Sequence, residues 1–492
     1  MKKISVLLSL FVALSVTLAG CSSDTTPLPI PSSTPAPLSA INLNLIFVVS
    51  PDLANNTLGD VDPNTANLTN QGLQRSLLMA TYLQKQVLGT KNVTGVYALE
   101  PMTHLQTVNN YPDMAALVSV QQFAMLNQIT LSGSSQPTNS YPLNASYASG
   151  AVPSGVATPS PFCPNCQGLV YSDEKFYNLA LATGIIEANV PGFHVFSAPW
   201  KTINTLLTNI NRIRGYNLSL PATYVSPNQI YAIAIAPSGS ASLVTFDSKL
   251  NPSGNYPVLP APPLVVATCP NSTTTPKLFT ISKTGGVDGA IIPANINKNE
   301  TIYFIRHAEA HPTRSFEDGN YVAAGQWRAL GLPNALQNAL RDNPPKQVYS
   351  IDPAQVIPGA PSATGNSNWS YVRPSLTVAP YAIANNLPYN LVAGFELLAV
   401  ESPKRTSEFF FKNGTFSGQT VLVAWEHDHI PWIVDELLSS YGGALKSAPT
   451  WPGNDYDTIW TVKLDDKGNL TVNNALCEGI DSTALPATAP LF

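Results

Sequence analysis

Two short segments of the chain end an apolar run with side chains that can do chemistry. In TIYFIRHAEAH, residues 301–311, the run stops at Arg306 and His307. In TVLVAWEHDH, residues 420–429, a second run stops at Glu426, His427 and Asp428. Four of the six histidines of the chain lie in these two segments. Imidazole, guanidinium and carboxylate groups gathered in this way indicate a catalytic site.

The elements that must position these groups are two short buried strands. Residues 301–305 and 421–425 are apolar or β-branched throughout, as in strands of a parallel sheet that is covered on both faces. Ligands of open α/β sheets bind just beyond the carboxyl ends of such strands. Both polar clusters follow a strand directly, and we therefore expect them at one edge of one sheet.

Three further segments follow in an order that resembles a known family. They are GQWRALGLPNALQ from Gly325, VYSIDP from Val348, and VRPSLTVAP, which contains Arg373. Together with Arg306-His307 and His427, they resemble the histidine phosphatase superfamily, the phosphoglycerate-mutase-like group. The resemblance covers roughly residues 301–464. Ala308 stands where the family usually has glycine.

This resemblance implies a phosphohistidine mechanism that needs no cofactor. His307 would attack phosphorus, and water would cleave the intermediate. Arg306, Arg373 and His427 would neutralise the phosphate, for which arginine suits because it stays charged and donates in rigid pairs. One branch of the family has its proton donor at the position of Asp428 and the other branch at that of Glu396. The expected substrate is a small phosphorylated molecule, and Glu426 and Glu309 are expected to be structural.

The first half of the chain resembles a degenerate copy of the second half. NLIFVVSP from Asn44 matches TIYFIRHA, LTNQGLQRSLLMATYLQ from Leu68 matches the segment around Gly325, and VYALEP from Val96 matches VYSIDP. At the positions of Arg306 and His307 the first copy has Val49 and Ser50. A match of the two Pro-Trp dipeptides sets Val195 opposite His427. The first half therefore reads as a scaffold or binding half.

The expected architecture is α/β, with two phosphoglycerate-mutase-like domains that each contain a mainly parallel sheet flanked by helices. The sequence predicts a degenerate domain over residues 41–255, a linker over 256–298, and a histidine phosphatase domain over 299–492. We expect the linker where proline, serine and asparagine accumulate, as in LNPSGNYPVLPAPP from Leu250.

The N-terminus has the pattern of a bacterial lipoprotein signal. Lys2 and Lys3 precede an apolar stretch that is too short to span a bilayer, and small residues precede Cys21. The sequence therefore predicts a signal peptide over residues 1–21, lipidation of Cys21 and a disordered tether over residues 22–40. The protein is expected in the cell envelope outside the cytoplasm, in contact with membrane through the lipid anchor only.

Charge and cysteines narrow the possibilities further. The net charge is −5 and no basic run occurs, which argues against a nucleic-acid partner. In an oxidising compartment the four cysteines after Cys21 favour disulfides. The expected pairs are Cys163 with Cys166, and Cys269 with Cys477.

Two other functions remain open on the sequence. The spacings of His307 with His311 and of His427 with His429 could bind a metal, as in a metal-dependent hydrolase. Alternatively, both halves could have lost catalysis, which would leave a surface-anchored binding or scaffold lipoprotein. Against the metal, Arg306 and Arg373 would lie beside a cation, an unfavourable arrangement unless a phosphate lies between them.

Overall fold

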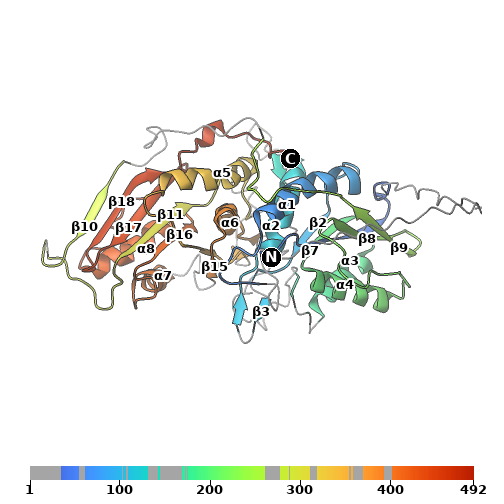
Figure 1. Cartoon of the computed structure of the whole chain (residues 1–492), viewed down its shortest axis with the longest axis horizontal. Helices are drawn as coiled ribbons and strands as arrows, with labels where there is room; N and C mark the ends of the chain where they lie inside the picture. The colour runs from blue at the N-terminus through green and yellow to red at the C-terminus, as the bar shows by residue number, and fades with distance from the viewer. Residues whose placement is uncertain are drawn as a thin grey trace, which may run out of the picture. The chain divides into compact units, whose positions relative to one another are not determined.

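The computed structural model is mixed α/β and contains two large sheets (Figure 1). Residues 35–492 form one compact unit. The structure describes residues 35–54, 61–101, 104–106, 109–130, 142–144, 169–171, 173, 176–260, 277–287, 289–310, 319–353, 356–357, 369–392 and 402–492. The signal peptide, Cys21 and most of the expected tether lie outside these residues. Leu38, which was expected in the tether, is instead buried, and its N–H donates to the Val87 carbonyl at 2.9 Å.

The first sheet has five strands, and helices flank it. Its order is β2 (Gly95–Ala98), β7 (Gly192–Ala198), β1 (Leu43–Val49), β8 (Gln229–Ile235) and β9 (Ala241–Asp247). Its described helices are α1 (Asn70–Tyr82), which a π-helical turn (Leu83–Val87) extends, α2 (Ala115–Leu126), α3 (Tyr177–Ala188) and α4 (Trp200–Arg214). Two small hairpins pair β3 (His104–Gln106) with β4 (Asn109–Tyr111), and β5 (Gln128–Thr130) with β6 (Pro142–Asn144).

The second sheet has seven strands and carries the chemical motifs. Its order is β10 (Thr280–Lys283), β18 (Leu470–Cys477), β17 (Thr458–Leu464), β11 (Glu300–Arg306), β16 (Thr420–Trp425), β12 (Gln347–Ile351) and β15 (Tyr389–Val392). Its described helices are α5 (Ala323–Ala339), α6 (Arg373–Asn385), α7 (Ser402–Phe411), α8 (His429–Ser440) and a short 3-10 turn (Ser482–Ala484). β13 (Val356–Ile357) pairs with β14 (Trp369–Ser370).

Neither sheet is mainly parallel in its pairing, contrary to expectation. In the first sheet β2, β7 and β1 pair in parallel, but β8 and β9 form antiparallel ladders. In the second sheet β11, β16, β12 and β15 pair in parallel, whereas β17, β18 and β10 add antiparallel ladders. Two of the antiparallel ladders have a local reason, because short connections join β8 to β9 and β17 to β18. Connections of this length form hairpins, because a parallel pair requires a longer crossover.

The domain boundaries stay predictions. Two contacts made by residues of the expected linker are described. β10 falls inside residues 256–298, where a linker was expected, and pairs with β18. The Tyr256 hydroxyl donates to the Leu330 carbonyl of α5 at 2.8 Å. Cys477 is disulfide-bonded, and every other cysteine lies outside the described residues, so both expected pairings stay predictions. No described helix is long and apolar enough to cross a membrane.

The two sheets agree in the way their strands and helices connect. With β1 set against β11, the strand orders β2-β7-β1-β8-β9 and β12-β16-β11-β17-β18 are the same. Val49 of β1 is paired with Ala198 of β7, just as Arg306 of β11 is paired with Trp425 of β16. This register corrects one sequence match, because it places Trp200, and not Val195, at the position that corresponds to His427.

An arginine–carboxylate ion pair recurs at matched positions of the two sheets. Arg75 Nε of α1 donates to Asp52 Oδ2 at 2.6 Å, and Arg328 Nε of α5 donates to Glu309 Oε1 at 2.8 Å. The same guanidinium groups also donate to carbonyls beyond the last hairpins, those of Leu250 at 2.7 Å and Ile480 at 2.9 Å. The helical turns just before the two arginines also match, since each contains a glycine three residues before the arginine. A Cβ on Gly72 or on Gly325 would lie 3.0 Å from the carbonyl oxygen of the paired acid, so each glycine permits the close approach.

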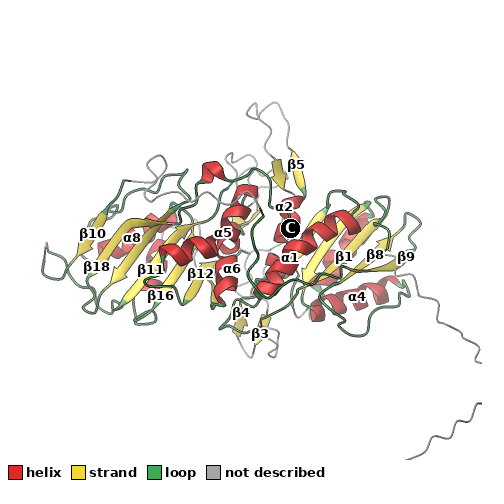
Figure 2. Ribbon diagram, turned by 45° about the horizontal axis from the view of Figure 1, so that its top comes forward, coloured by secondary structure: helices red, strands yellow, loops and turns green. Residues whose placement is uncertain are grey.

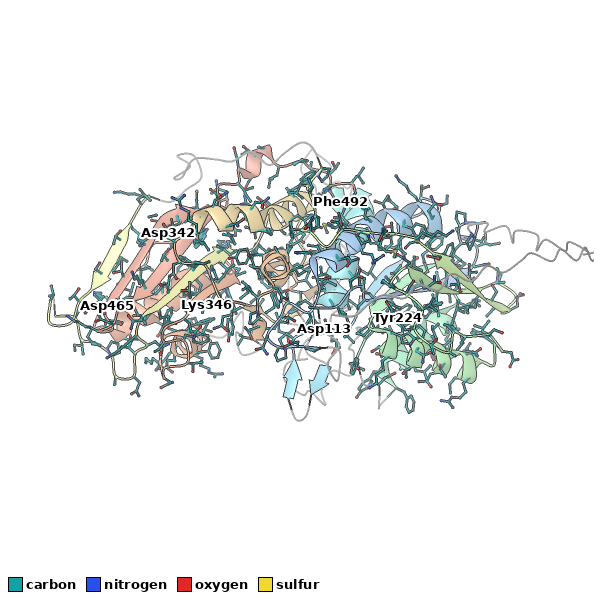
Figure 3. The ribbon with its side chains drawn as sticks, in the orientation of Figure 1. Asp113, Tyr224, Asp342, Lys346, Asp465 and Phe492 are labelled. Carbon is teal, nitrogen blue, oxygen red and sulfur yellow. The ribbon has the colours of Figure 1, made fainter. Side chains whose placement is uncertain are left out.

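Apolar packing joins the helices that lie between the sheets. One cluster of buried side chains contains Phe47 of β1 and Leu77 of α1 together with Leu330 of α5 and Leu376 of α6. Figure 2 shows these helices between the two sheets. On its other face, the second sheet packs against α7 and α8 in a separate cluster. The C-terminal residue, Phe492, lies beside the first-sheet helices in Figure 3 and packs on the shared cluster.

Glu300, at the start of β11, gives the fold a pH dependence that can be measured. Its side chain is fully buried, and burial raises its pKa to about 8 against the lowering effect of Asn297. The unfolded chain loses this proton near the ordinary value of 4.5. Between the two values the folded protein binds more protons, so stability should fall as pH rises, by up to about 1.4 kcal/mol per pH unit.

Glu300→Gln should flatten that part of the curve of unfolding free energy against pH. Denaturant titrations at several pH values between 5 and 8 would measure it. Glu187→Gln is the matched control, because the Glu187 side chain is 64% exposed. Equal slopes in the wild type and Glu300→Gln would contradict the expectation.

Candidate functional site

Strands β11 and β16 carry the two motifs to the same edge of the second sheet, as expected. The strands are parallel neighbours, and their last residues, Arg306 and Trp425, face each other. The His307 N–H then donates to the Trp425 carbonyl at 2.9 Å. His307 and Glu426 therefore leave the sheet side by side. Lys346 before β12 and Asp465 after β17, both labelled in Figure 3, belong to the opposite edge.

His307 is a buried, neutral imidazole with a fixed tautomer. Its ring is 2% exposed, and Nδ1 lies 2.8 Å from the Ala308 carbonyl oxygen. A carbonyl only accepts, so Nδ1 must carry the hydrogen, and Nε2 keeps its lone pair. Burial, together with the positive charges of Arg373 and Arg306, holds the pKa of His307 well below its ordinary value. A neutral imidazole with an available lone pair is what a nucleophile requires.

Arg306 is held by one loop, residues 453–456. Its Nη1 donates to the carbonyls of Gly453 at 2.7 Å and Asp455 at 3.2 Å, and its guanidinium carbon lies 3.9 Å from the centre of the Tyr456 ring. Its Nε is buried and has no hydrogen-bond partner among the described residues. A buried guanidinium N–H of this kind is costly without an acceptor, which an anion in the site would supply.

Arg373 begins α6 and completes the positive side of the site. It is 5% exposed, and its guanidinium lies 4.8 Å from the Tyr371 ring centre. Its Nη1 donates to the Asn320 carbonyl at 3.4 Å. Tyr371 and Tyr456 also contact His307, at ring distances of 6.0 Å and 6.1 Å. Each arginine thus stacks on a tyrosine that also packs against the histidine.

Thr377 joins this helix to the Arg-His motif. Its hydroxyl accepts from the Ala308 N–H at 2.8 Å and donates to the Arg373 carbonyl at 2.8 Å. Thr377, Tyr371, Tyr456 and Asn320 were not predicted from the sequence. The spacing of Arg373 and Thr377, one helical turn apart, was the one visible signal. Tyr456 and Asn320 lie in loops with no recognisable motif.

His427 lies beside this cluster, and a shared carboxylate holds it. Its Nδ1 pairs with Glu426 Oε1, while His429 Nδ1 lies 2.9 Å from Glu426 Oε2. Burial alone would raise the pKa of Glu426, but hydrogen bonds from His427 and His429 hold it well below the ordinary value. A Cβ on Gly453 would lie 4.0 Å from His427 Nε2, and the Gly453 carbonyl binds Arg306. The residue 453 loop therefore touches both strand ends.

Of the two candidate proton donors, Asp428 and Glu396, the structure describes only Asp428. The Asp428 side chain is 62% exposed, and its Oδ1 lies 3.9 Å from His427 Nε2. Glu396 lies outside the described residues. Glu309 pairs with Arg328 behind the site, in the structural position expected for it.

A metal could be held by only one group of neighbouring ligands among the described residues. The ligand atoms of Glu426, His427 and Asp428 all lie within 4.8 Å of one another. His311 lies outside the described residues, and His429 Nδ1 is directed to Glu426. The expected pairing of His307 with His311 is therefore not described, and the Nδ1 of His307 meets a carbonyl oxygen.

The solved structures that match part of this chain share little sequence with it. A phosphoglycerate mutase from Plasmodium falciparum has 15% identity and a TM-score of 0.24, covering 39% of this chain and 96% of its own. A putative phosphohistidine phosphatase from Agrobacterium tumefaciens has 15% identity and a TM-score of 0.22, covering 33% and 91%. The neighbours are phosphoglycerate-mutase and phosphohistidine-phosphatase folds. Likeness at this level carries no argument about chemistry.

A third neighbour, titled Mycobacterial hydrolase 2, has 10% identity and a TM-score of 0.24, covering 36% of this chain and 91% of its own. No family model and no curated protein matches the chain.

Proposed function

We propose that this chain hydrolyses phosphomonoesters through a phosphohistidine on His307. The observation that carries the proposal is a neutral, buried imidazole whose Nδ1 is committed to the Ala308 carbonyl, within electrostatic range of Arg306 and Arg373. Two buried guanidinium groups beside one nucleophile suit the charge that spreads over the equatorial oxygens of a transferring phosphoryl group.

In the first step, the His307 Nε2 lone pair forms a bond to phosphorus as the bond to the leaving oxygen breaks. A carboxylic acid, Asp428 or Glu396, gives its proton to that oxygen. In the second step water attacks phosphorus, the P–N bond breaks and the carboxylate takes the proton of the water. Glu426 serves poorly as the donor because its lowered pKa keeps it ionised, and it instead orients His427.

The proposal also includes an internal duplication, the class of substrate and the lipid anchor. The matched strand orders and the repeated arginine pairs of Arg75 and Arg328 support a duplication in which the first copy has lost its reactive residues. Ala115 begins α2 where Arg373 begins α6. Substrates would be small phosphate esters outside the cytoplasm, the chain being anchored through a lipid on Cys21.

A trapping experiment tests the covalent step. The full chain, mixed with a radiolabelled aryl phosphate and quenched in alkali within one turnover, should retain label on the protein. The label should be lost in mild acid, as expected of a phosphoramidate bond. Protein that turns over substrate without ever carrying label would contradict the proposal.

Removal of metal separates this mechanism from a metallohydrolase. Hydrolysis should be unchanged after dialysis against EDTA, because no step needs a metal. Loss of activity that zinc restores would instead favour metal bound by Glu426, His427 and Asp428. Inactivity on several phosphate esters from acidic to neutral pH would favour a binding or scaffold role.

A further inference from the structure

Two neighbouring glutamines of α2 reach from the first sheet's helices into the half that carries the site. Gln121 and Gln122 are 3% and 1% exposed. Gln121 Nε2 donates to Asn320 Oδ1 at 2.9 Å, and Asn320 Nδ2 donates back to Gln121 Oε1 at 3.0 Å. Such a reciprocal amide pair, buried from water, fixes both side chains, because breaking it would cost two buried hydrogen bonds.

Asn320 in turn holds the start of α6. Its backbone carbonyl accepts from Arg373 Nη1, at the long end of hydrogen-bond range, 3.4 Å. The preceding carbonyl, that of Gly319, accepts from the backbone N–H groups of Val372 at 3.0 Å and Arg373 at 3.1 Å. Residues 319 and 320 therefore contact both the backbone and the guanidinium of Arg373. Asn320 Oδ1 also accepts from the Tyr321 N–H at 2.8 Å, which fixes the loop locally.

We infer that Gln121 is a positioning residue for the phosphate site, so that the first half, which has Val49 and Ser50 where the second has Arg306 and His307, holds Arg373 in place through Asn320. The inference rests on the proposed function, since it assumes that Arg373 binds the phosphoryl group. It gives the first half a role in catalysis that involves no contact with substrate. A displaced guanidinium would lose part of its paired donation to phosphate, which depends strongly on direction.

Gln122 supplies a matched control on the same helix. Its Oε1 accepts from Gln326 Nε2 at 2.8 Å, and its Nε2 donates to the Pro490 carbonyl at 2.6 Å. Gln326 lies on α5, and its Oε1 accepts from the Tyr321 hydroxyl at 2.6 Å. The two glutamines thus make similar buried contacts across the halves, but the carbonyl that Arg373 binds belongs to the residue that Gln121 holds.

The test compares Gln121→Met with Gln122→Met in the full chain. Methionine keeps the length of the side chain and removes the hydrogen bonds, so both variants should unfold at lower temperature than the wild type. Inorganic phosphate is the probe, and its affinity is measured by calorimetry without turnover. Gln121→Met should bind phosphate about tenfold more weakly, the loss expected for one hydrogen bond to a charged group. Gln122→Met should bind it as the wild type does.

A double-mutant cycle with Arg373→Met keeps the result independent of folding. If Gln121 acts through Arg373, Gln121→Met should have no further effect on phosphate affinity once Arg373 is replaced. Equal phosphate affinity in the two glutamine variants, or additive effects in the cycle, would overturn the inference while leaving the proposed function intact. A wild type that neither binds phosphate nor hydrolyses esters would instead overturn the proposed function.

Discussion

His307→Asn is expected to lower kcat for phosphate ester hydrolysis at least about 10³-fold, because asparagine cannot accept the phosphoryl group. The surrounding arginines remain, so inorganic phosphate should still bind. Steady-state kinetics on several phosphate esters, beside calorimetric phosphate titrations, would measure both effects. The split between turnover and binding distinguishes a lost nucleophile from a collapsed site.

His194→Asn is the matched control for this substitution. His194 is buried on β7 of the first sheet, where its Nδ1 lies 3.3 Å from the Tyr97 hydroxyl. It should lose stability but retain kcat per folded molecule. If His307→Asn retained more than a tenth of the wild-type kcat, the nucleophile assignment would be wrong.

The pH profile gives an independent check on His307. Its pKa lies well below the ordinary value of 6.5, because burial and then the charges of Arg373 and Arg306 disfavour the imidazolium. The neutral, reactive form therefore persists below pH 6.5. Loss of kcat/KM, which reports the enzyme without substrate, should begin through protonation of His307 only at more acidic pH.

Arg328→Met is expected to destabilise the protein by about 3–5 kcal/mol, because it leaves buried carboxylates without their cation. The Arg328 side chain is fully buried, pairs with Glu309 and Glu478, and has Asp457 Oδ1 at 3.7 Å. Denaturant unfolding at neutral pH would measure the loss. Protonation neutralises these acids, so the loss should shrink at lower pH.

Arg75→Met in the first half provides the comparison. Among the residues that the structure describes, Arg75 has one carboxylate partner, Asp52, whose side chain is 18% exposed, so water can compensate for part of the loss. Its substitution should therefore cost less than that of Arg328. A larger cost at Arg75 would show that the number of buried acids does not decide the effect.

The local elements of the site could be predicted from the sequence, whereas their cross-contacts could not. Burial of a whole strand, followed directly by polar residues, is a local pattern, and it located Arg306, His307 and His427 at one sheet edge. Tyr456 is remote in the chain from Arg306, on which it stacks, and Asn320 lies 53 residues from Arg373, which it binds. Only folding brings these residues to the arginines, so no spacing of residues in the sequence predicted the contacts.

Two errors of the sequence analysis have physical causes. The hairpin strands β17 and β18 contain stretches in which polar and apolar residues alternate, as in TVKL and LTVN, a sequence pattern that favours antiparallel pairing. The Pro-Trp match failed because Pro199 directly follows β7, whereas Pro431 lies inside α8. Identical dipeptides thus occupied different structural positions, and only the register of β1 with β7 could align them.

The bond between His307 Nδ1 and the Ala308 carbonyl also has a consequence for product analysis. With that nitrogen committed, phosphorylation can yield a single regioisomer, τ-phosphohistidine, whose phosphorus is bonded to Nε2. Phosphorus NMR of the trapped and digested protein would distinguish it from the π isomer. The backbone of one alanine would thereby fix which ring nitrogen carries the phosphoryl group in the proposed intermediate.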